Sequence, residues 1–273
     1  IQAIILGIIQ GITEFLPISS TAHLEVFTKL FHWDSLGSKA FLATIQFGSV
    51  IAVLMYFWLD INKILFGGFR AFKKKQWHSQ YWRLIVGIAI GTLPILIFGF
   101  LLKKTLNKED SAINSMTVIA ITSIVMSLLL GLAEKFGSRE RNFKQLQIMD
   151  GILMGLGQAI ALVPGASRSG TTLTAGLFLG LERKSAAKFS FLLGIPALTI
   201  ATLYEFFKEV LGTDINLFLV LAGVISAFIF SYISIAWLLK YLQTKNIWVF
   251  VWYRLGFGLF ILLGIFTNVL RNS

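Results

Sequence analysis

Six long apolar stretches constrain this chain more than any other feature of its sequence. Each is close to the length that a membrane-crossing helix needs, about 20 mostly apolar residues. The six stretches are Phe41–Trp58, Tyr81–Leu102, Met116–Leu132, Phe189–Tyr204, Leu217–Leu239 and Trp248–Phe266. Charged residues make up only 14% of the chain, against about 25% in a typical soluble domain. The pattern therefore predicts an all-α polytopic membrane protein.

Two further apolar stretches are interrupted by proline. Ile1–Leu16 ends at Pro17, and Gly151–Val163 ends at Pro164. As helices they would reach only about 20–24 Å, short of the roughly 30 Å hydrocarbon core. Each is followed by a hydroxyl-rich segment and a second short apolar stretch, which predicts a re-entrant helix pair. The first stretch lacks a basic start and carries Glu14, so a cleaved signal peptide is not expected. Because the chain begins without Met, we expect the first few native residues to be missing.

The two broken stretches resemble each other, which indicates an internal repeat. Residues 7–20 align with residues 155–167 with a one-residue gap, and three spanning stretches follow in each half. The chain therefore reads as a single membrane domain, 1–273, with repeats at about 1–140 and 148–273. An odd number of crossings per half forces the copies into opposite orientations. The sequence thus predicts two inverted-topology repeats, each with one re-entrant helix pair plus three transmembrane helices, and a site where the broken helices meet.

The distribution of positive charge predicts the orientation in the membrane. If residues 60–82 form a cytoplasmic loop, the loops at 134–149, 181–188 and 240–246 are cytoplasmic too. That side then holds about twice as many Lys and Arg residues as the other, as the positive-inside rule requires. The net charge of +11 is accounted for in this way, without a nucleic-acid partner. The mouth of the first re-entrant pair is then outside, and that of the second is inside.

A first group of polar residues lies in the first broken stretch. Gln10 and Glu14 are four residues apart, so they share one face of a helix. An ionisable residue inside a membrane segment is costly, which makes Glu14 a functional candidate. Two oxygen-bearing side chains there could hold a divalent cation, Mg²⁺ or Ca²⁺, with help from a substrate phosphate. The alternative is that both side chains are polar contacts between helices.

Hydroxyl groups follow the break at Pro17. Ser19, Ser20 and Thr21 lie where a new helix is expected to begin, and the first N–H groups of a helix suit an anion. His23, close by in the sequence, could act as a base toward a serine nucleophile. The alternative is that the hydroxyl groups only cap the helix.

The second broken stretch leads into a segment suited to phosphate. Gly165 permits close approach of the backbone, the hydroxyl groups of Ser167, Ser169 and Thr172 can donate to oxyanions, and Arg168 offers a planar fork of donors. A P-loop is excluded, because no Gly-Lys-Ser/Thr follows the glycines. The alternative is a helix-packing motif with Arg168 reaching the membrane surface.

Together these segments supply a carboxylate, a histidine, hydroxyl groups, an arginine and two helix starts. Such a set favours phosphoryl transfer, which needs positioning and charge neutralisation. A phosphate substrate inside a bilayer carries a lipid tail, so the sequence predicts a lipid-phosphate or lipid-diphosphate hydrolase. The absence of cysteine excludes thiolate metal sites and Cys nucleophiles. Arg254, in the last spanning stretch, is expected either to pair with an acid or to reach the interface, with a structural role favoured.

At this point the sequence resembles the bacterial undecaprenyl-diphosphate phosphatases linked with bacitracin resistance. The family's (E/Q)-x-x-x-E segment is present at residues 10–14, and its P-G-x-S-R-S-x-x-T signature at residues 164–172. Residues 19–21, His23 and residues 189–196 also match, and the resemblance covers nearly the whole chain.

The resemblance implies an enzyme of the bacterial cytoplasmic (inner) membrane that removes the terminal phosphate of undecaprenyl diphosphate. The product is the lipid carrier that peptidoglycan synthesis reuses. Divalent-cation dependence and a site open to the outer face are also implied. Glu14, His23 and Arg168 are the expected essential residues, with Ser20 and Ser167 nearby.

One departure from the family pattern bears on the mechanism. Some members carry Glu where this chain has Gln10, so a pair of carboxylates cannot be required here. We expect Arg168 and the nearby N–H groups to bind the diphosphate, and Ser20 or a water to attack the terminal phosphorus. His23 is expected to act as general base or acid, and Glu14 to bind the cation or orient His23.

Two other classes of function remain as alternatives. Inverted repeats with broken helices are also a transporter architecture, so a transporter or flippase of undecaprenyl phosphate is the strongest rival. A non-catalytic lipid-binding scaffold would not explain Glu14, His23 and Arg168 together. The expected partners are the polyprenyl-diphosphate substrate and membrane lipids, with a homodimer as the assembly considered.

Overall fold

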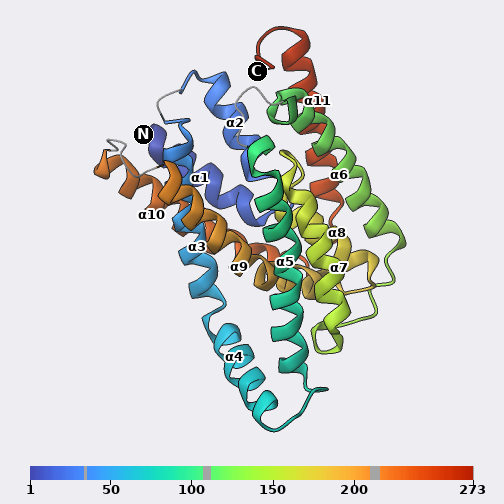
Figure 1. Ribbon diagram of the computed structural model, residues 1–273. Helices are drawn as coiled ribbons and strands as arrows, with labels where there is room; N and C mark the ends of the chain where they lie inside the picture. Colours follow the sequence, from blue (N-terminus) through green and yellow to red (C-terminus); the bar gives the residue numbers. More distant parts are fainter. Residues whose placement is uncertain (34–35, 107–111, 210–215, 273) are drawn as a thin grey trace.

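The computed structural model describes residues 1–33, 36–106, 112–209 and 216–272 of the chain (Figure 1). Within these ranges the fold is all-helical, with eleven α-helices and three short 3-10 helices. The 3-10 helices are η1 (Ala112–Asn114), η2 (Phe143–Gln145) and η3 (Ile160–Leu162). The prediction of an all-α membrane protein is confirmed at this level.

Six of the α-helices are long and apolar enough to cross a membrane. They are α3 (Lys39–Tyr56), α5 (Gln80–Leu106), α6 (Met116–Phe136), α9 (Arg183–Glu209), α10 (Leu217–Tyr241) and α11 (Trp248–Phe266). Each contains or closely overlaps one of the six predicted stretches, so those predictions are confirmed. Of these six helices, α9 extends furthest beyond its predicted stretch, because it continues toward polar residues at both ends.

Two pairs of short helices occupy the broken stretches. The first pair is α1 (Gln2–Phe15) and α2 (Ser20–Leu30), and the second is α7 (Ile148–Ala159), extended by η3, and α8 (Arg168–Phe178). With 14 residues, α1 is about 21 Å long, too short to cross the hydrocarbon core. Both α1 and the α7–η3 segment end shortly before the prolines that the sequence singled out, because a residue that precedes proline disfavours the helical conformation.

The segment 60–82, expected to be a cytoplasmic connection between two spans, is largely helical. It contains most of helix α4 (Trp58–Lys73) and the start of α5. The buried face of α4 consists of Ile64, Gly68 and Ala71, and it packs on α5. The sequence analysis missed this helix because its apolar residues are interrupted by basic ones and do not form one continuous run.

Glycines allow the short helices to pack unusually close to the long ones. In α7, Gly151 and Gly155 lie against Gly87 and Gly91 of α5, where an added Cβ would overlap backbone atoms. In α1, Gly7 and Gly11 lie in the same way against α10. Small residues at helix contacts are typical of membrane bundles, in which close backbone approach maximises van der Waals contact. These contacts hold both broken segments inside the bundle.

Replacing Gly155 by Ala tests the close packing of α7 on α5. The new methyl group would lie 2.1 Å from the carbonyl oxygen of Gly91, so the two helices must separate. We expect the unfolding free energy to fall by about 1–3 kcal/mol, which thermal unfolding in detergent measures as a lower Tm. Gly256→Ala is the matched control, since nothing lies within 4 Å of the added atom. A Gly155→Ala variant that melts at or above the wild type would contradict this packing.

Candidate functional site

A buried ion pair joins the two broken segments. Arg168, the first residue of α8, donates from Nη2 to Glu14 Oε1, near the end of α1, at 3.0 Å. The side chains are only 11% and 7% exposed. Each charge inside the apolar bundle would be expensive alone, and each is the other's partner. Residues 154 positions apart in the chain therefore meet at one point, as the repeat pattern predicts.

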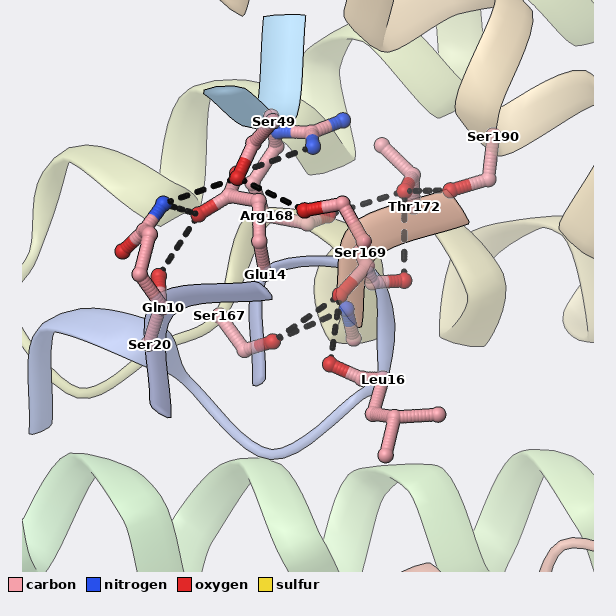
Figure 2. A network of polar contacts seen from close by, with 12 residues as sticks. Gln10, Glu14, Leu16, Ser20, Ser49, Ser167, Arg168, Ser169, Thr172 and Ser190 are labelled. Carbon is pink, nitrogen blue, oxygen red and sulfur yellow. Dashed lines mark hydrogen bonds and ion pairs between the residues drawn. The ribbon is translucent and has the colours of Figure 1, made fainter. Parts of the chain in front are cut away.

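Hydroxyl and amide groups complete the surroundings of Glu14 (Figure 2). Ser20 donates to Glu14 Oε2 at 2.7 Å, and the Gln10 amide donates to the same oxygen at 3.2 Å. Gln10 also reaches the hydroxyl group of Ser49 on α3 at 3.4 Å, and Ser231 on α10 donates to Ser49 at 2.9 Å. Both carboxylate oxygens are therefore held by donors from several helices.

The two helix starts have the same local geometry. Ser19 is the N-cap of α2 and Ser167 is the N-cap of α8, and each side chain accepts a hydrogen bond from the backbone N–H three residues later. Both residues have a positive φ, 75° and 70°, which is uncommon outside glycine and stores strain. The backbone thus turns sharply at both breaks and presents two helix N-termini, which favour an anion.

The remaining hydroxyl groups of the second segment stabilise its position. Ser169 donates to the carbonyl of Leu16 at 2.9 Å, so it ties the start of α8 to the first break. Thr172 donates to the Arg168 carbonyl at 2.8 Å and shares a hydrogen bond with Ser190 of α9. Neither hydroxyl group can donate to a ligand without giving up one of these bonds.

A cavity of about 210 Å³ opens beside the ion pair. Its polar lining includes seven of the residues that the sequence singled out: Glu14, Ser19, Ser20, Thr21, Gly165, Ser167 and Arg168. Apolar side chains of α5, η3 and α9, among them Ile95, Leu162 and Leu198, form the rest of the wall. A cavity lined by both polar and apolar side chains suits a phosphate group attached to a hydrocarbon tail.

The Arg168 guanidinium group keeps unused donor capacity. Its Nη2 is bound to Glu14, whereas Nε is buried and has no hydrogen-bond partner among the described residues. Nη1 lies against Gly194 of α9, at a place where a Cβ atom would be 1.8 Å away. Position 194 must therefore be glycine for the guanidinium group to lie here, because any side chain there would displace it.

The structure places His23 away from the cavity lining. Its Nδ1 lies 2.7 Å from the carbonyl oxygen of Ser19, so Nδ1 carries the proton, and Nε2 accepts from the hydroxyl group of Tyr253 at 2.7 Å. The ring also stacks on Phe257 with the centroids 4.0 Å apart. Both ring nitrogens are thus occupied, and the histidine fixes the backbone of the first break. The prediction that it acts as a general base stays a prediction.

Arg254 has neither of the two partners expected from the sequence. It is fully buried, and it donates to the carbonyl oxygens of Pro17, Gly165 and Ala166 at 3.3, 2.9 and 3.0 Å. These carbonyls lack helical partners because the chain is broken there. One guanidinium group therefore clamps both breaks together, and the expectation of an acid partner or an interfacial position is wrong for the part of the chain that the structure describes.

Several polar residues of this site were missed by the sequence analysis. Ser49, Ser190 and Ser231 join the network, Gln46 lines the cavity, and Tyr253 holds the histidine. The signal that could have found them is the presence of single polar residues within otherwise apolar spans. That signal is weak, since such residues also occur at ordinary helix contacts.

The residues present do not form a complete cation site by themselves. Glu14 is the one carboxylate in the described cavity lining, and its oxygens already accept from Arg168, Ser20 and Gln10. The described residues contain no group of three or more His, Asp or Glu side chains placed to hold a metal. A divalent cation usually takes about six oxygen ligands, so other oxygens must supply most of them.

The fold defines a multi-pass membrane protein in which two broken helix pairs meet at the buried Glu14–Arg168 pair. Residues 3–260 match the protein family described as "Bacitracin resistance protein BacA", and the chain belongs to this family. It is similar to proteins named "Undecaprenyl-diphosphatase" from Trichormus variabilis, Trichodesmium erythraeum and Thermosynechococcus vestitus, at 54%, 49% and 52% identity. These alignments cover 100%, 100% and 94% of this chain, and 86%, 88% and 93% of the relatives. The family resemblance seen in the sequence is therefore confirmed.

Replacing Arg254 by Met tests the clamp at the two breaks. Three buried carbonyl oxygens would lose their donor, and we expect a loss of about 3–5 kcal/mol in the unfolding free energy. Arg254→Lys keeps the charge without the fork and is expected to fall between Met and the wild type. Thermal unfolding in detergent measures both, with Arg271→Met at an exposed position as control. If Arg254→Met melts like the control, the clamp is unimportant for stability.

Proposed function

We infer that this chain is an undecaprenyl-diphosphatase, which hydrolyses undecaprenyl diphosphate to undecaprenyl phosphate and inorganic phosphate. Relatives with that name match it at about half identity over nearly their whole length. The observation that carries the chemistry is the Glu14–Arg168 pair between two helix N-termini at an amphipathic cavity. Regeneration of the monophosphate would supply the lipid carrier for cell-envelope synthesis.

We propose that the start of α8 binds the diphosphate. Arg168 lines the cavity, as do Ser19 and Ser167, the N-caps of α2 and α8, so the guanidinium group and the two helix N-termini would stabilise charge on the terminal phosphate. Ser19, Thr21 and Ser167 add hydroxyl groups there. The apolar wall would hold the first part of the polyprenyl tail.

Ser20 is the proposed nucleophile. It lines the cavity, and its hydroxyl group already donates to Glu14 at 2.7 Å, which is the nucleophile–base distance that covalent catalysis requires. Ser20 Oγ would attack the terminal phosphorus as Glu14 accepts its proton, and the phosphoanhydride bond would break to release undecaprenyl phosphate. Water would then hydrolyse the phosphoserine. His23 would support this step indirectly. It donates to the carbonyl oxygen of Ser19, the residue that directly precedes Ser20.

We also propose that the two halves are inverted repeats. Contacts between the halves have counterparts made by the corresponding helices. Helix α1 packs on α10 as α7 packs on α5, and α2 contacts α11 as α8 contacts α6. The matching caps at Ser19 and Ser167 support the same relation. Superposition of the two halves in an experimental structure, about an axis in the membrane plane, tests it.

The cavity is proposed to open toward the outer face of the bacterial cytoplasmic membrane. The support is the unequal distribution of Lys and Arg. The loops that hold most of them are assigned to the cytoplasmic side by the positive-inside rule. The chain has no cysteine, so Thr21→Cys provides a single reactive thiol at the cavity. A membrane-impermeant thiol reagent should label it in intact cells. Labelling only in inverted vesicles would indicate that the cavity opens toward the cytoplasm.

Phosphate release in detergent micelles separates hydrolysis from transport, because a micelle has no two sides. We expect the wild type to release phosphate from undecaprenyl diphosphate, and Arg168→Ala and Glu14→Gln to lose about 10²–10³-fold in rate. Gly194→Ala should have a comparable effect, because its methyl group displaces the Arg168 guanidinium. Gly256→Ala is the matched control. No release by the wild type would favour the transporter, and unchanged release by the variants would refute this site.

The serine route predicts a covalent intermediate. Acid quenching during turnover of the wild type should trap phosphate on the peptide that contains Ser20, and mass spectrometry should locate it. Ser20→Ala should lose both the phosphopeptide and turnover. A Ser20→Ala variant with full turnover would instead identify water as the attacking group.

We propose that a divalent cation, Mg²⁺ or Ca²⁺, binds together with the diphosphate, through Glu14 and substrate oxygens. Glu14 already has Arg168 as its charge partner, so the free protein should bind Mg²⁺ weakly. Calorimetry is expected to show Mg²⁺ binding only when a diphosphate lipid is present, and chelator should abolish phosphate release. Tight binding to the free protein, or release that a chelator leaves unchanged, would contradict this proposal.

A further inference from the structure

Helix α4 carries a second apolar face, opposite to the one that packs on α5. This α4 face consists of Trp58, Leu59, Leu65, Phe66, Phe69 and Phe72, all of which are exposed. Leu59 and Phe66 are each 70% exposed, and Phe69 is 57% exposed. Six large apolar side chains on one short helix would be unfavourable if water surrounded them. The face therefore needs a nonaqueous partner.

The α4 face lies at one surface of the bundle rather than within the hydrocarbon core. Helix α3 precedes it and is about 27 Å long, nearly the full thickness of the core. In α5, Arg83 donates to the carbonyl of Lys144, in the polar connection between α6 and α7. Gly68 of α4 packs on Ile85, two residues further along α5. The second half of α4 therefore lies at or beyond that polar connection, at the end of the molecule opposite the C-terminus (Figure 1).

Positive charge surrounds the α4 face. Helix α4 and the turn that follows it form a hairpin with α5, and this hairpin has five exposed cations: Lys63, Arg70, Lys73, Lys74 and Lys75. The hairpin's single acid, Asp60, is paired with Lys188 of α9 at 2.7 Å. Lys73 also lies over the ring of Phe69, with Nζ 4.6 Å from the centroid. Basic residues beside an aromatic face are the composition of a helix that lies in the headgroup layer.

We propose that α4 is a surface helix that binds anionic phospholipid, with its aromatic side chains below the headgroups and its Lys and Arg side chains among the phosphates. Each cation near an anionic surface strengthens such binding. A second copy of the chain is a poorer occupant, because two such faces would bring ten cations together. This lipid contact is separate from the catalytic cavity and does not depend on the proposed reaction.

Spin labelling tests this proposal directly, because the wild-type chain contains no cysteine. Phe69→Cys places one label on the α4 face, and Gln76→Cys places a control label on the exposed turn that follows the helix. In nanodiscs of phosphatidylglycerol, we expect the label at 69 to be at least threefold more accessible to oxygen than to a nickel chelate. The label at 76 should show the reverse. In phosphatidylcholine, or after Lys73, Lys74 and Lys75 are all replaced by Gln, the preference at 69 should weaken.

Three results would overturn the proposal. A label at 69 that the nickel chelate reaches freely in both lipids would place the face in water. An equal oxygen preference in phosphatidylglycerol and phosphatidylcholine would remove the role of anionic lipid. Dipolar broadening between labels at 69, seen only in nanodiscs with two copies, would identify a second copy as the occupant. Since Phe69 is exposed, its replacement should leave Tm unchanged, and a lowered Tm would show that this side chain packs within the protein.

Discussion

The buried pair of Glu14 and Arg168 is the interaction on which the arrangement of this protein depends. A lone charge at this depth would cost several kcal/mol, so neither segment could hold its ionised group there without the other. The pair therefore requires both broken helices to enter the bundle and to end at the same point. Gln10 and Ser20 donate to the second carboxylate oxygen, so both oxygens have donors from the protein. The same contacts that stabilise the fold place a carboxylate, an arginine and a hydroxyl group beside one cavity.

Broken helices create a second requirement, which Arg254 meets. Each break leaves carbonyl groups without helical partners, and such groups are costly away from water. The fork of one guanidinium group reaches carbonyls from both breaks, so the two turns are fixed relative to each other. His23 and Tyr253 add a further link to the first turn. The strained conformations at Ser19 and Ser167 persist because these contacts over-determine them.

Much of the fold could be predicted from local pattern. Spans such as α6 and α10 follow from length and apolarity alone, because a bilayer demands about 20 apolar residues in helix. Helix α4 could not be predicted in this way, since its character depends on a position beside α5 at the surface of the bundle. The residues Ser49 and Tyr253 were missed for a related reason: a polar side chain in an apolar span has no recognisable role until its partner on another helix is known.

The sequence by itself determined the class of protein, the six spans, the two proline breaks and the polar segments that follow them. It did so because hydrophobic length, proline and short motifs act locally along the chain. Only the tertiary structure decided which atoms meet. It directed Arg168 to Glu14, Arg254 to three backbone carbonyls and His23 to Tyr253, away from the cavity. The physical reason is that a hydrogen bond depends on distances of about 3 Å between helices, and residue order does not specify those distances.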